Sequence, residues 1–190
     1  MNKIIWPLLL CAVLCGCGGG ETGNAVQEQY RTLETARLEA EVTSHTSTDS
    51  RTFTLLCSYD ADGDAVTIVT DPGELAGLTA VVSGTDMTLS SEGLQLPAGA
   101  SLDICPANCL PYLLRALADG YVLEQSSEAL DDTPCLRLAL DTTAPGGGKV
   151  LCAVWLDAEG LFPRYAEFSR NEQVVLTVKL LAFTCTTSEG

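Results

Sequence analysis

Histidine, basic residues and aromatic residues are all scarce in this chain of 190 residues. It contains one histidine, His45, and its 10 lysines and arginines face 25 aspartates and glutamates, which gives a formal net charge of −15. A single histidine excludes a metal site built from several histidines. The acidic excess disfavours binding to nucleic acid and electrostatic adsorption to anionic lipid. We therefore expect no nucleic-acid partner, and we attribute the acidity to solubility.

A catalytic constellation is also lacking. His45 lies on the polar side of an alternating segment with Glu39 and Glu41, as a solvated surface histidine does. The sequence has no Gly-x-Ser-x-Gly elbow of the kind that serine hydrolases carry, and no pattern brings a base to a cysteine nucleophile. The sequence therefore predicts no catalytic residue, no metal, no cofactor and no enzymatic activity.

Four aspartates are spaced like ligands of a calcium loop: Asp60, Asp62, Asp64 and Asp71. Ala65 replaces the glycine that such a loop needs at its sixth position, and residues 65–70 alternate like a strand. We interpret residues 60–64 as a hairpin turn, which aspartate and glycine favour.

A long apolar run occurs only at the N-terminus. After a short positive start that contains Lys3, the chain is apolar from Ile4 to Leu14 apart from Pro7. This run is too short to cross a bilayer, which needs about 20 residues, but it is typical of a secretory signal peptide. It ends in Leu14-Cys15-Gly16-Cys17, which is similar to the bacterial lipobox.

The lipobox pattern predicts that residues 1–16 are a lipoprotein signal peptide and that Cys17 begins the mature chain. Cys17 would carry a diacylglyceryl group and often an N-acyl chain such as palmitate, and two or three chains anchor a protein firmly. We therefore expect an exported protein that is anchored to the outer face of the cell membrane by a lipid on Cys17. The alternative is an ordinary signal peptide that happens to contain cysteines.

The mature chain would have 174 residues and, besides Cys17, six cysteines: Cys57, Cys105, Cys109, Cys135, Cys152 and Cys185. An even number of cysteines in an exported domain favours disulfides, but six cysteines allow 15 pairings. Cys135 and Cys152 lie on consecutive expected strands, which suggests the pair Cys135–Cys152. A local pair Cys105–Cys109 and a remaining pair Cys57–Cys185 are possible. Cys105 and Cys109 could also pair elsewhere or hold a metal.

The hydrophobic periodicity predicts two helices and about 10 or 11 strands. The glycine-rich residues 17–24 predict a flexible tether. Residues 25–37 have apolar residues at helical spacing, and residues 108–119 carry a leucine stripe that ends before Gly120. Strands are expected at 38–45, 52–59, 65–70, 78–83, 86–90, 93–96, 121–126, 134–140, 149–157, 162–169 and 173–184.

Some expected strands are apolar on both faces, which indicates that the sheet is covered on both sides. A twisted sheet of this size tends to curl, and curling would enclose an apolar concavity. Six residues of the two helices could line a lipid cavity there or fill an ordinary core, since both need the same periodicity: Val26, Tyr30, Leu110, Leu113, Leu114 and Leu117.

Short phrases accompany this order of elements: the segment Pro72-Gly73-Glu74-Leu75-Ala76-Gly77, and later Val154-Trp155-Leu156-Asp157 and Pro163-Arg164-Tyr165-Ala166-Glu167. Together with the lipobox and the two helices, they resemble the LolA/LolB-like lipoprotein-carrier superfamily, which includes GerS-like germination lipoproteins of spore formers. The similarity covers about residues 25–185.

This resemblance implies an α+β, mainly β fold over residues 25–190: a curved antiparallel sheet, shaped as an unclosed half-barrel, with two helices against its concave face. It implies binding of a lipid or an acylated protein in the concavity, or alternatively a protein-interaction or scaffold role in the cell envelope or spore without a lipid ligand. A diffusing carrier must not be anchored, so Cys17 favours a tethered binder. No individual functional residue carries over.

Overall fold

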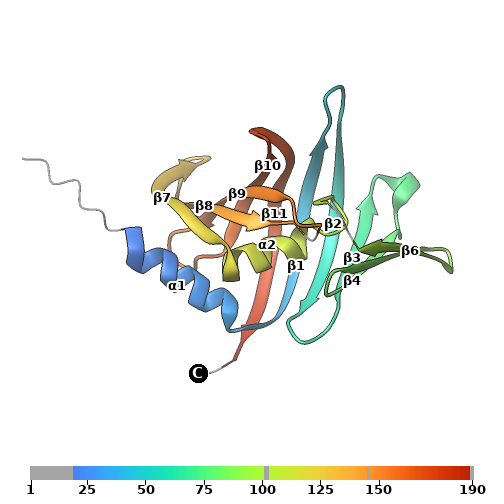
Figure 1. Ribbon diagram of the computed structural model, residues 1–190, viewed down its shortest axis with the longest axis horizontal. Coiled ribbons are helices and arrows are strands. Elements are labelled where there is room, and N and C mark those ends of the chain that lie inside the picture. Colours follow the sequence, from blue (N-terminus) through green and yellow to red (C-terminus); the bar gives the residue numbers. More distant parts are fainter. Residues whose placement is uncertain (1–18, 101–102, 145, 189–190) are drawn as a thin grey trace, which may run out of the picture.

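A single antiparallel sheet of eleven strands dominates the computed structural model, which describes residues 19–100, 103–144 and 146–188 (Figure 1). In chain order the strands are β1 (Leu33–His45), β2 (Ser50–Asp60), β3 (Ala65–Asp71), β4 (Thr79–Ser83), β5 (Asp86–Ser91), β6 (Leu94–Ala100), β7 (Tyr121–Leu130), β8 (Thr133–Thr143), β9 (Lys149–Asp157), β10 (Pro163–Arg170) and β11 (Gln173–Thr187). A short 3₁₀ turn, η1 (Gly73–Leu75), follows β3.

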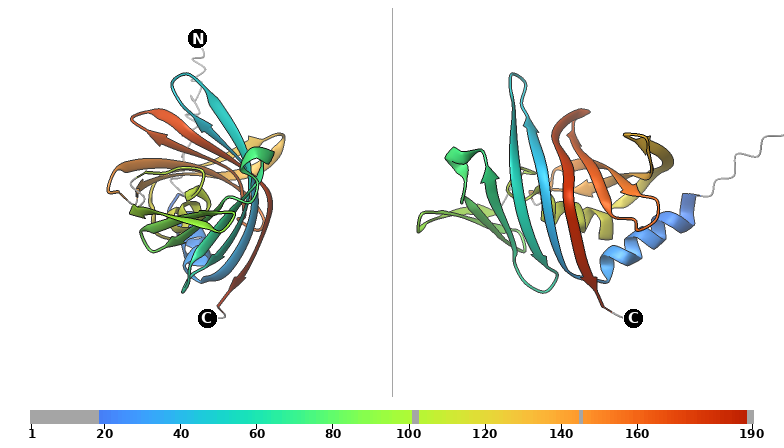
Figure 2. Two further views of the ribbon diagram at one scale, coloured as in Figure 1. Left: turned by 90° about the vertical axis from the view of Figure 1, so that its right-hand side faces the viewer. Right: turned by 180° about the vertical axis from the view of Figure 1, so that it is seen from behind.

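Two meanders make up this sheet. Its order is β6-β5-β4-β3-β2-β1-β11-β10-β9-β8-β7, so the first strand pairs with the last and all other neighbours are consecutive in the chain. The free edges are β6 and β7. The sheet curls without closing (Figure 2), which confirms the predicted half-barrel.

Two helices, α1 (Gly19–Arg31) and α2 (Cys109–Asp119), lie against the concave side of the sheet, as predicted. Nine of the eleven residues of α2 are buried. They pack with inward side chains of β1, β2 and β8–β11 in one core cluster. The side-chain amide of Gln27 donates to the carbonyl of Gly120 at 2.6 Å and so joins α1 to the end of α2. Neither helix of the described residues is long and apolar enough to cross a bilayer.

The first helix starts and ends about six residues earlier than predicted. Residues 19–24, which we expected in a flexible tether, are helical, and residues 33–37 belong to β1. Gly23 allows α1 to approach β7 closely, since a Cβ there would lie 3.2 Å from the Gln125 side chain. Tertiary packing therefore extends a helix through a segment whose glycines alone predict flexibility.

A β-bulge explains the error at the other end of α1. Leu33 lies opposite Thr187 and Thr35 lies opposite Thr186, so Glu34 is an extra residue in β1. The bulge separates the buried side chains of Leu33 and Ala36 by three positions instead of two. This local spacing imitates a helix and hides the start of the strand.

The helices cover only part of the concave face. Strands β3–β6, residues 65–100, extend beyond them, and we call this region the wing (Figure 1). Its inner face holds a second, small buried cluster, formed by Ala65, Ala80, Val82 and Met87. Cys105 and Ala107, in the segment that leads into α2, pack on this cluster. The wing therefore has an inner face that no helix covers.

Replacing Leu113 of α2 by alanine is expected to lower the free energy of unfolding by about 2–5 kcal/mol, because it removes buried methyl groups and leaves a cavity. Leu113 is fully buried, whereas Leu123 on β7 is 55% exposed. The matched change Leu123→Ala should shift the same free energy by less than about 0.5 kcal/mol. Urea unfolding followed by circular dichroism measures both. Equal losses in the two variants would contradict a core centred on α2.

Candidate functional site

The six residues that we predicted as cavity lining are packed together under the helices. Val26 and Tyr30 of α1 and the four leucines of α2 are all buried members of one cluster. The Tyr30 hydroxyl donates to the carbonyl of Leu161 at 3.0 Å, and burial raises the pKa of this phenol far above its usual value. These side chains contact other protein groups, and their role in ligand binding stays a prediction.

The open part of the concavity lies on the wing. Ala80 faces Leu89 across β4 and β5, and Leu89 faces Leu96 across β5 and β6, so all three share the inner face with the buried cluster. Leu94, two residues from Leu96, lies on the same face. Leu89 is half-buried, whereas Leu96 and Leu94 are 57% and 63% exposed. We call Leu89, Leu94 and Leu96 the wing strip. It continues the buried cluster outward to the free edge of the sheet.

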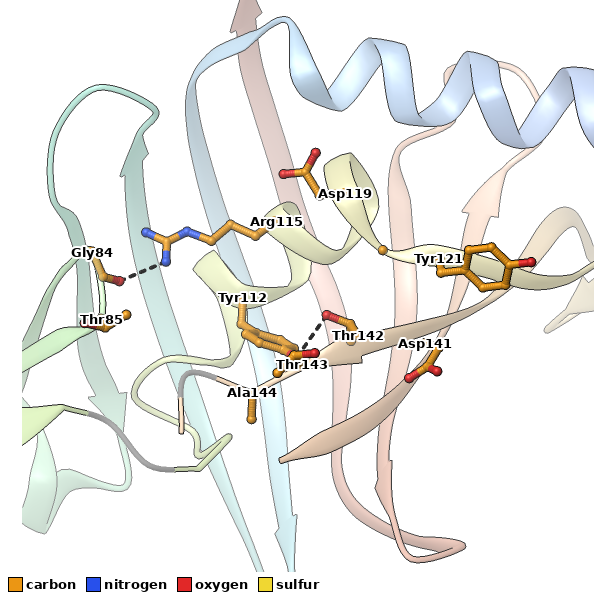
Figure 3. Close-up of a pocket in the computed structure, with 11 residues that line it drawn as sticks. Gly84, Thr85, Tyr112, Arg115, Asp119, Tyr121, Asp141, Thr142, Thr143 and Ala144 are labelled. Carbon is orange, nitrogen blue, oxygen red and sulfur yellow. Dashed lines mark hydrogen bonds between the residues drawn. The ribbon is translucent and has the colours of Figure 1, made fainter. Parts of the chain in front are cut away.

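A cleft of about 570 Å³ separates the wing from the other half of the sheet (Figure 3). Its walls are the turn between β4 and β5, helix α2, and the end of β8 with the residues that follow it. Arg115 donates to the Gly84 carbonyl at 2.9 Å and ties α2 to the wing. The hydroxyls of Tyr112 and Thr142 are 3.1 Å apart. Arg115, Asp119 and Asp141 also line the cleft, so charged and apolar groups both border it.

Strand register overturns two of the three suggested disulfides. Cys135 lies opposite Asp157, whereas Cys152 lies opposite Leu140, five residues away along β8. That offset is about 17 Å, and a disulfide needs Cα atoms within about 7 Å. Cys57 and Cys185 belong to β2 and β11, which lie on opposite sides of β1. Two strand spacings of about 4.8 Å separate these strands, so the two Cα atoms are also too far apart for a disulfide.

Cys105 and Cys109 are not bonded to each other either, and all six described cysteines are free thiols. The cysteines nearest one another surround the start of α2. The amide of Cys109 donates to the carbonyl of Cys105 at 3.0 Å. Burial raises the pKa of the Cys109 thiol, and the neighbouring Cys105 and Cys57 raise it further. These thiols are poor nucleophiles, because burial keeps them protonated.

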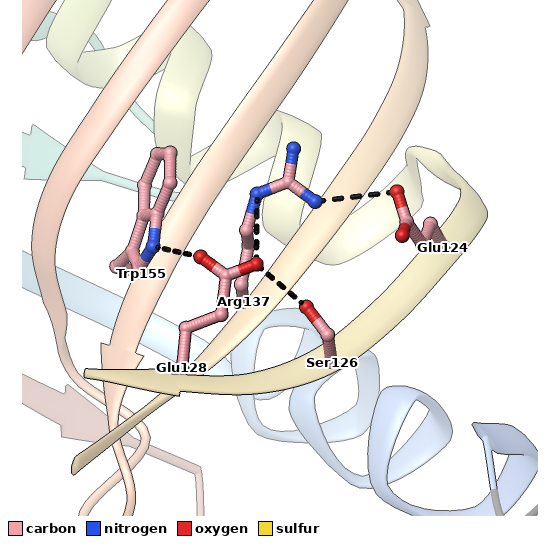
Figure 4. A network of polar contacts seen from close by, with 5 residues as sticks. All are labelled: Glu124, Ser126, Glu128, Arg137 and Trp155. Carbon is pink, nitrogen blue, oxygen red and sulfur yellow. Dashed lines mark hydrogen bonds and ion pairs between the residues drawn. The ribbon is translucent and has the colours of Figure 1, made fainter. Parts of the chain in front are cut away.

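A polar network on the outer face of β7–β9 was missed by the sequence reasoning (Figure 4). Glu128 accepts hydrogen bonds from the Trp155 indole and the Ser126 hydroxyl, both at 3.0 Å. Arg137 pairs with Glu124 at 3.3 Å and lies over the Trp155 ring at 5.3 Å. Each of these side chains has a partner within the network. We infer that the network holds β7, at the edge of the sheet, to β8 and β9. The alternation of Glu124, Ser126 and Glu128 was the available signal.

The remaining sequence candidates have structural roles. The His45 ring nitrogens contact the hydroxyls of Ser50 and Thr177, at 3.0 and 3.2 Å. Asp60 accepts a hydrogen bond from the Asp62 amide in the turn between β2 and β3, as predicted for a hairpin. No group of three or more metal-ligating side chains is found in the part of the chain that the structure describes. Cys17 lies outside the described residues.

No protein-family model matches the chain, and no curated protein matches its sequence. Several solved structures are similar. A DUF1329 family protein from Desulfovibrio piger is 12% identical with a TM-score of 0.53, over 89% of this chain and 94% of that chain. An uncharacterized conserved protein from Thermus thermophilus is 9% identical with a TM-score of 0.53, over 88% of each chain. A LolA superfamily protein from Nitrosomonas europaea is 12% identical with a TM-score of 0.47, over 88% of this chain and 94% of that chain.

The Desulfovibrio piger and Thermus thermophilus proteins, each with a TM-score of 0.53, share the fold of this chain over almost its whole length. At these identities the similarity concerns the fold alone, and residues of the similar proteins do not transfer to this chain. The binding properties of the site are therefore inferred from its own geometry.

The stability of the protein should fall as the pH rises above about 9 under reducing conditions. Burial raises the pKa of the Cys57 thiol to about 11, and burial also raises the pKa of Cys152. The folded state keeps these protons where the unfolded chain has lost them, so the stabilisation is complete below the unfolded pKa and is lost as the pH rises toward the folded value. Urea unfolding at about pH 7.5 and about pH 10 measures it. Cys57→Ala should weaken this pH dependence, and a free energy of unfolding that stays constant would argue against buried neutral thiols.

Proposed function

We propose that this protein is an exported, lipid-anchored, non-enzymatic binding protein that holds an apolar ligand on the inner face of its wing. The ligand class is an acyl chain, carried by a lipid or by an acylated protein. The wing strip carries this proposal, because it is an apolar surface that extends from a buried cluster and is left open on the concave side of the sheet.

The energetics favour the wing over the region beneath the helices. Covering Leu94 and Leu96, each more than half exposed, would contribute roughly 1–2 kcal/mol per side chain. An acyl chain that entered between α2 and the sheet would first have to displace fully buried leucines such as Leu113 and Leu117. Opening that core would cost several kcal/mol. A ligand on the wing strip requires no such rearrangement.

The anchor distinguishes this protein from a diffusing carrier. A lipid on Cys17 would keep the binding surface at one membrane, which suits an acceptor or a tethered adaptor. The net charge of −15 gives the surface no means of electrostatic adsorption to anionic lipid. Covalent lipidation is therefore what would hold the protein in place.

Replacing Leu94 and Leu96 together by asparagine is expected to weaken binding of a fluorescent fatty acid at least tenfold, because two apolar contacts are lost. Leu56→Asn with Ile68→Asn is the matched control, since these side chains are 42% and 38% exposed and lie opposite each other on β2 and β3. The control should bind as the parent protein does. Unchanged binding in the wing variant would refute this ligand site.

A second candidate function is docking of an extended segment from an envelope protein. The edge strand β6 has the sequence Leu-Gln-Leu-Pro-Ala-Gly-Ala, without charge, and its described side chains are exposed. Exposed edges are usually blocked by charges, and Pro97 is the one blocking residue here. Chemical crosslinking of the anchored protein would favour this alternative if it captured a partner while mass spectrometry of the purified protein found no lipid.

Replacing Cys17 by serine is expected to release the protein from the membrane fraction, because the side chain that takes the lipid is absent. The matched control is Cys15→Ser, which leaves the residue of the predicted processing site in place. Membrane fractionation and immunoblotting measure both variants. A Cys17→Ser protein that stays with the membrane would contradict the anchor.

A further inference from the structure

Strand β11 continues well past the end of its neighbour β10. It has 15 residues, whereas β10 has 8, and the pairing between them ends at Lys179 opposite Tyr165. On its other side β11 stays paired with β1 as far as Thr187. Residues 180–187 therefore have one side that no described strand covers, where β11 runs on past β10 toward the C-terminus (Figure 2).

A groove of about 510 Å³ lies beside this uncovered side of β11. Residues 180–183 of β11 and residues 162–164 at the start of β10 are among those that line it. The rings of Phe162 and Phe183 pack together with their centroids 5.3 Å apart. Leu181 is 48% exposed and Phe162 is 38% exposed. The groove therefore offers apolar side chains next to the open edge of a strand.

The main chain of this edge determines which kind of partner suits the groove. In a strand that is paired on one side, every second residue directs its N–H and C=O away from the neighbouring strand. Along residues 180–187 these groups need water or a second extended main chain as partners. The four groove residues of β11 would run beside about 13 Å of such a chain. An acyl chain has no hydrogen-bonding groups along its length and would leave this edge unsatisfied, whereas a peptide satisfies it.

Arg164 adds a positive charge to the groove. Its side chain is exposed and forms no ion pair within the part of the chain that the structure describes. Two carboxylates also line the groove. Asp157 accepts hydrogen bonds from the amides of Glu159 and Gly160 in its own turn, and Asp131 belongs to the turn between β7 and β8. An arginine left free in a chain with a net charge of −15 favours a carboxylate from a partner.

We propose that an extended segment of another protein docks in this groove as an added strand beside residues 180–187, with apolar side chains against Phe162 and Leu181 and a carboxylate on Arg164. Main-chain hydrogen bonds would supply affinity, and the side-chain contacts would supply specificity. A second copy of this chain would bring another net charge of −15, which opposes self-association. The site lies on the other half of the sheet from the wing strip and does not rest on the proposed acyl ligand.

Binding of defined peptides tests the carboxylate contact. The probes are eight dye-labelled, capped octapeptides in which valine and threonine alternate, each with one glutamate at a different position, and eight counterparts with glutamine instead. Fluorescence polarisation measures their binding to the full-length protein in detergent. At least one glutamate peptide should bind about tenfold more tightly than its glutamine counterpart, because a hydrogen-bonded charge pair forms with Arg164. Absence of peptide binding, or equal binding of all pairs, would overturn the proposal.

Two arginine variants separate this contact from the overall charge. Arg164→Gln should remove the preference for glutamate, whereas Arg37→Gln should preserve it. Arg37 is likewise exposed and without an ion pair among the described residues, but it lies on β1, opposite Thr184 and on the far side of β11 from the groove. Both changes remove one positive charge, so an equal effect of the two would contradict a specific contact with Arg164.

Hydrogen exchange followed by NMR locates the bound peptide. In the free protein, alternate amides of residues 180–187 should exchange fast, and a saturating peptide should protect them severalfold. Leu181→Asn should weaken binding, whereas Leu123→Asn, an equally exposed site on β7, should not. Protection of β6 in place of β11, or loss of binding in the variant Leu94→Asn with Leu96→Asn, would overturn this location. A dimer of the parent protein that Leu181→Asn dissociates would assign the groove to a second copy and overturn the proposed partner.

Discussion

The pairing of β1 with β11 holds the two halves of this protein together. These are the two longest strands, and their pairing runs from Leu33 opposite Thr187 to Ser44 opposite Leu176 with two shifts of register. Every other pairing joins consecutive strands, which the local chain can form by itself. The β1–β11 pairing joins segments about 140 residues apart in sequence and so closes the largest loop. Without it, the helices would have half a sheet to pack against, and the core cluster would be open on one side.

The uneven cover of the concave face follows from this arrangement. Both helices lie on the half of the sheet that contains β7–β11 and the two strands next to it, where α2 inserts its leucines. The sheet is longer than two short helices can cover, so the meander β3–β6 is left with a small cluster of its own. Its inner apolar residues are consequently graded from buried Val82 to exposed Leu94. An apolar surface that neither helix covers thus results from the mismatch between sheet length and helix length.

Strand alternation and the leucine stripe of α2 were sufficient to predict the strands, the second helix and their order. Features that depend on the exact register of the strands could not be predicted from these patterns. The bulge at Glu34 made the beginning of β1 look helical, and the register of β8 against β9 placed Cys135 and Cys152 far apart. Periodicity also places Leu89, Leu94 and Leu96 on the same apolar face without distinguishing their exposure. In the structure Leu89 is half-buried, whereas Leu94 and Leu96 are exposed. That difference depends on where the helices stop, which is a tertiary property.

The early start of α1 changes what the lipobox implies. With a flexible spacer of eight residues, the anchor would restrict the position of the domain but leave its orientation free. The structure instead has a helix from Gly19 that packs against β7 at Gly23, so residues 19–24 belong to the folded domain.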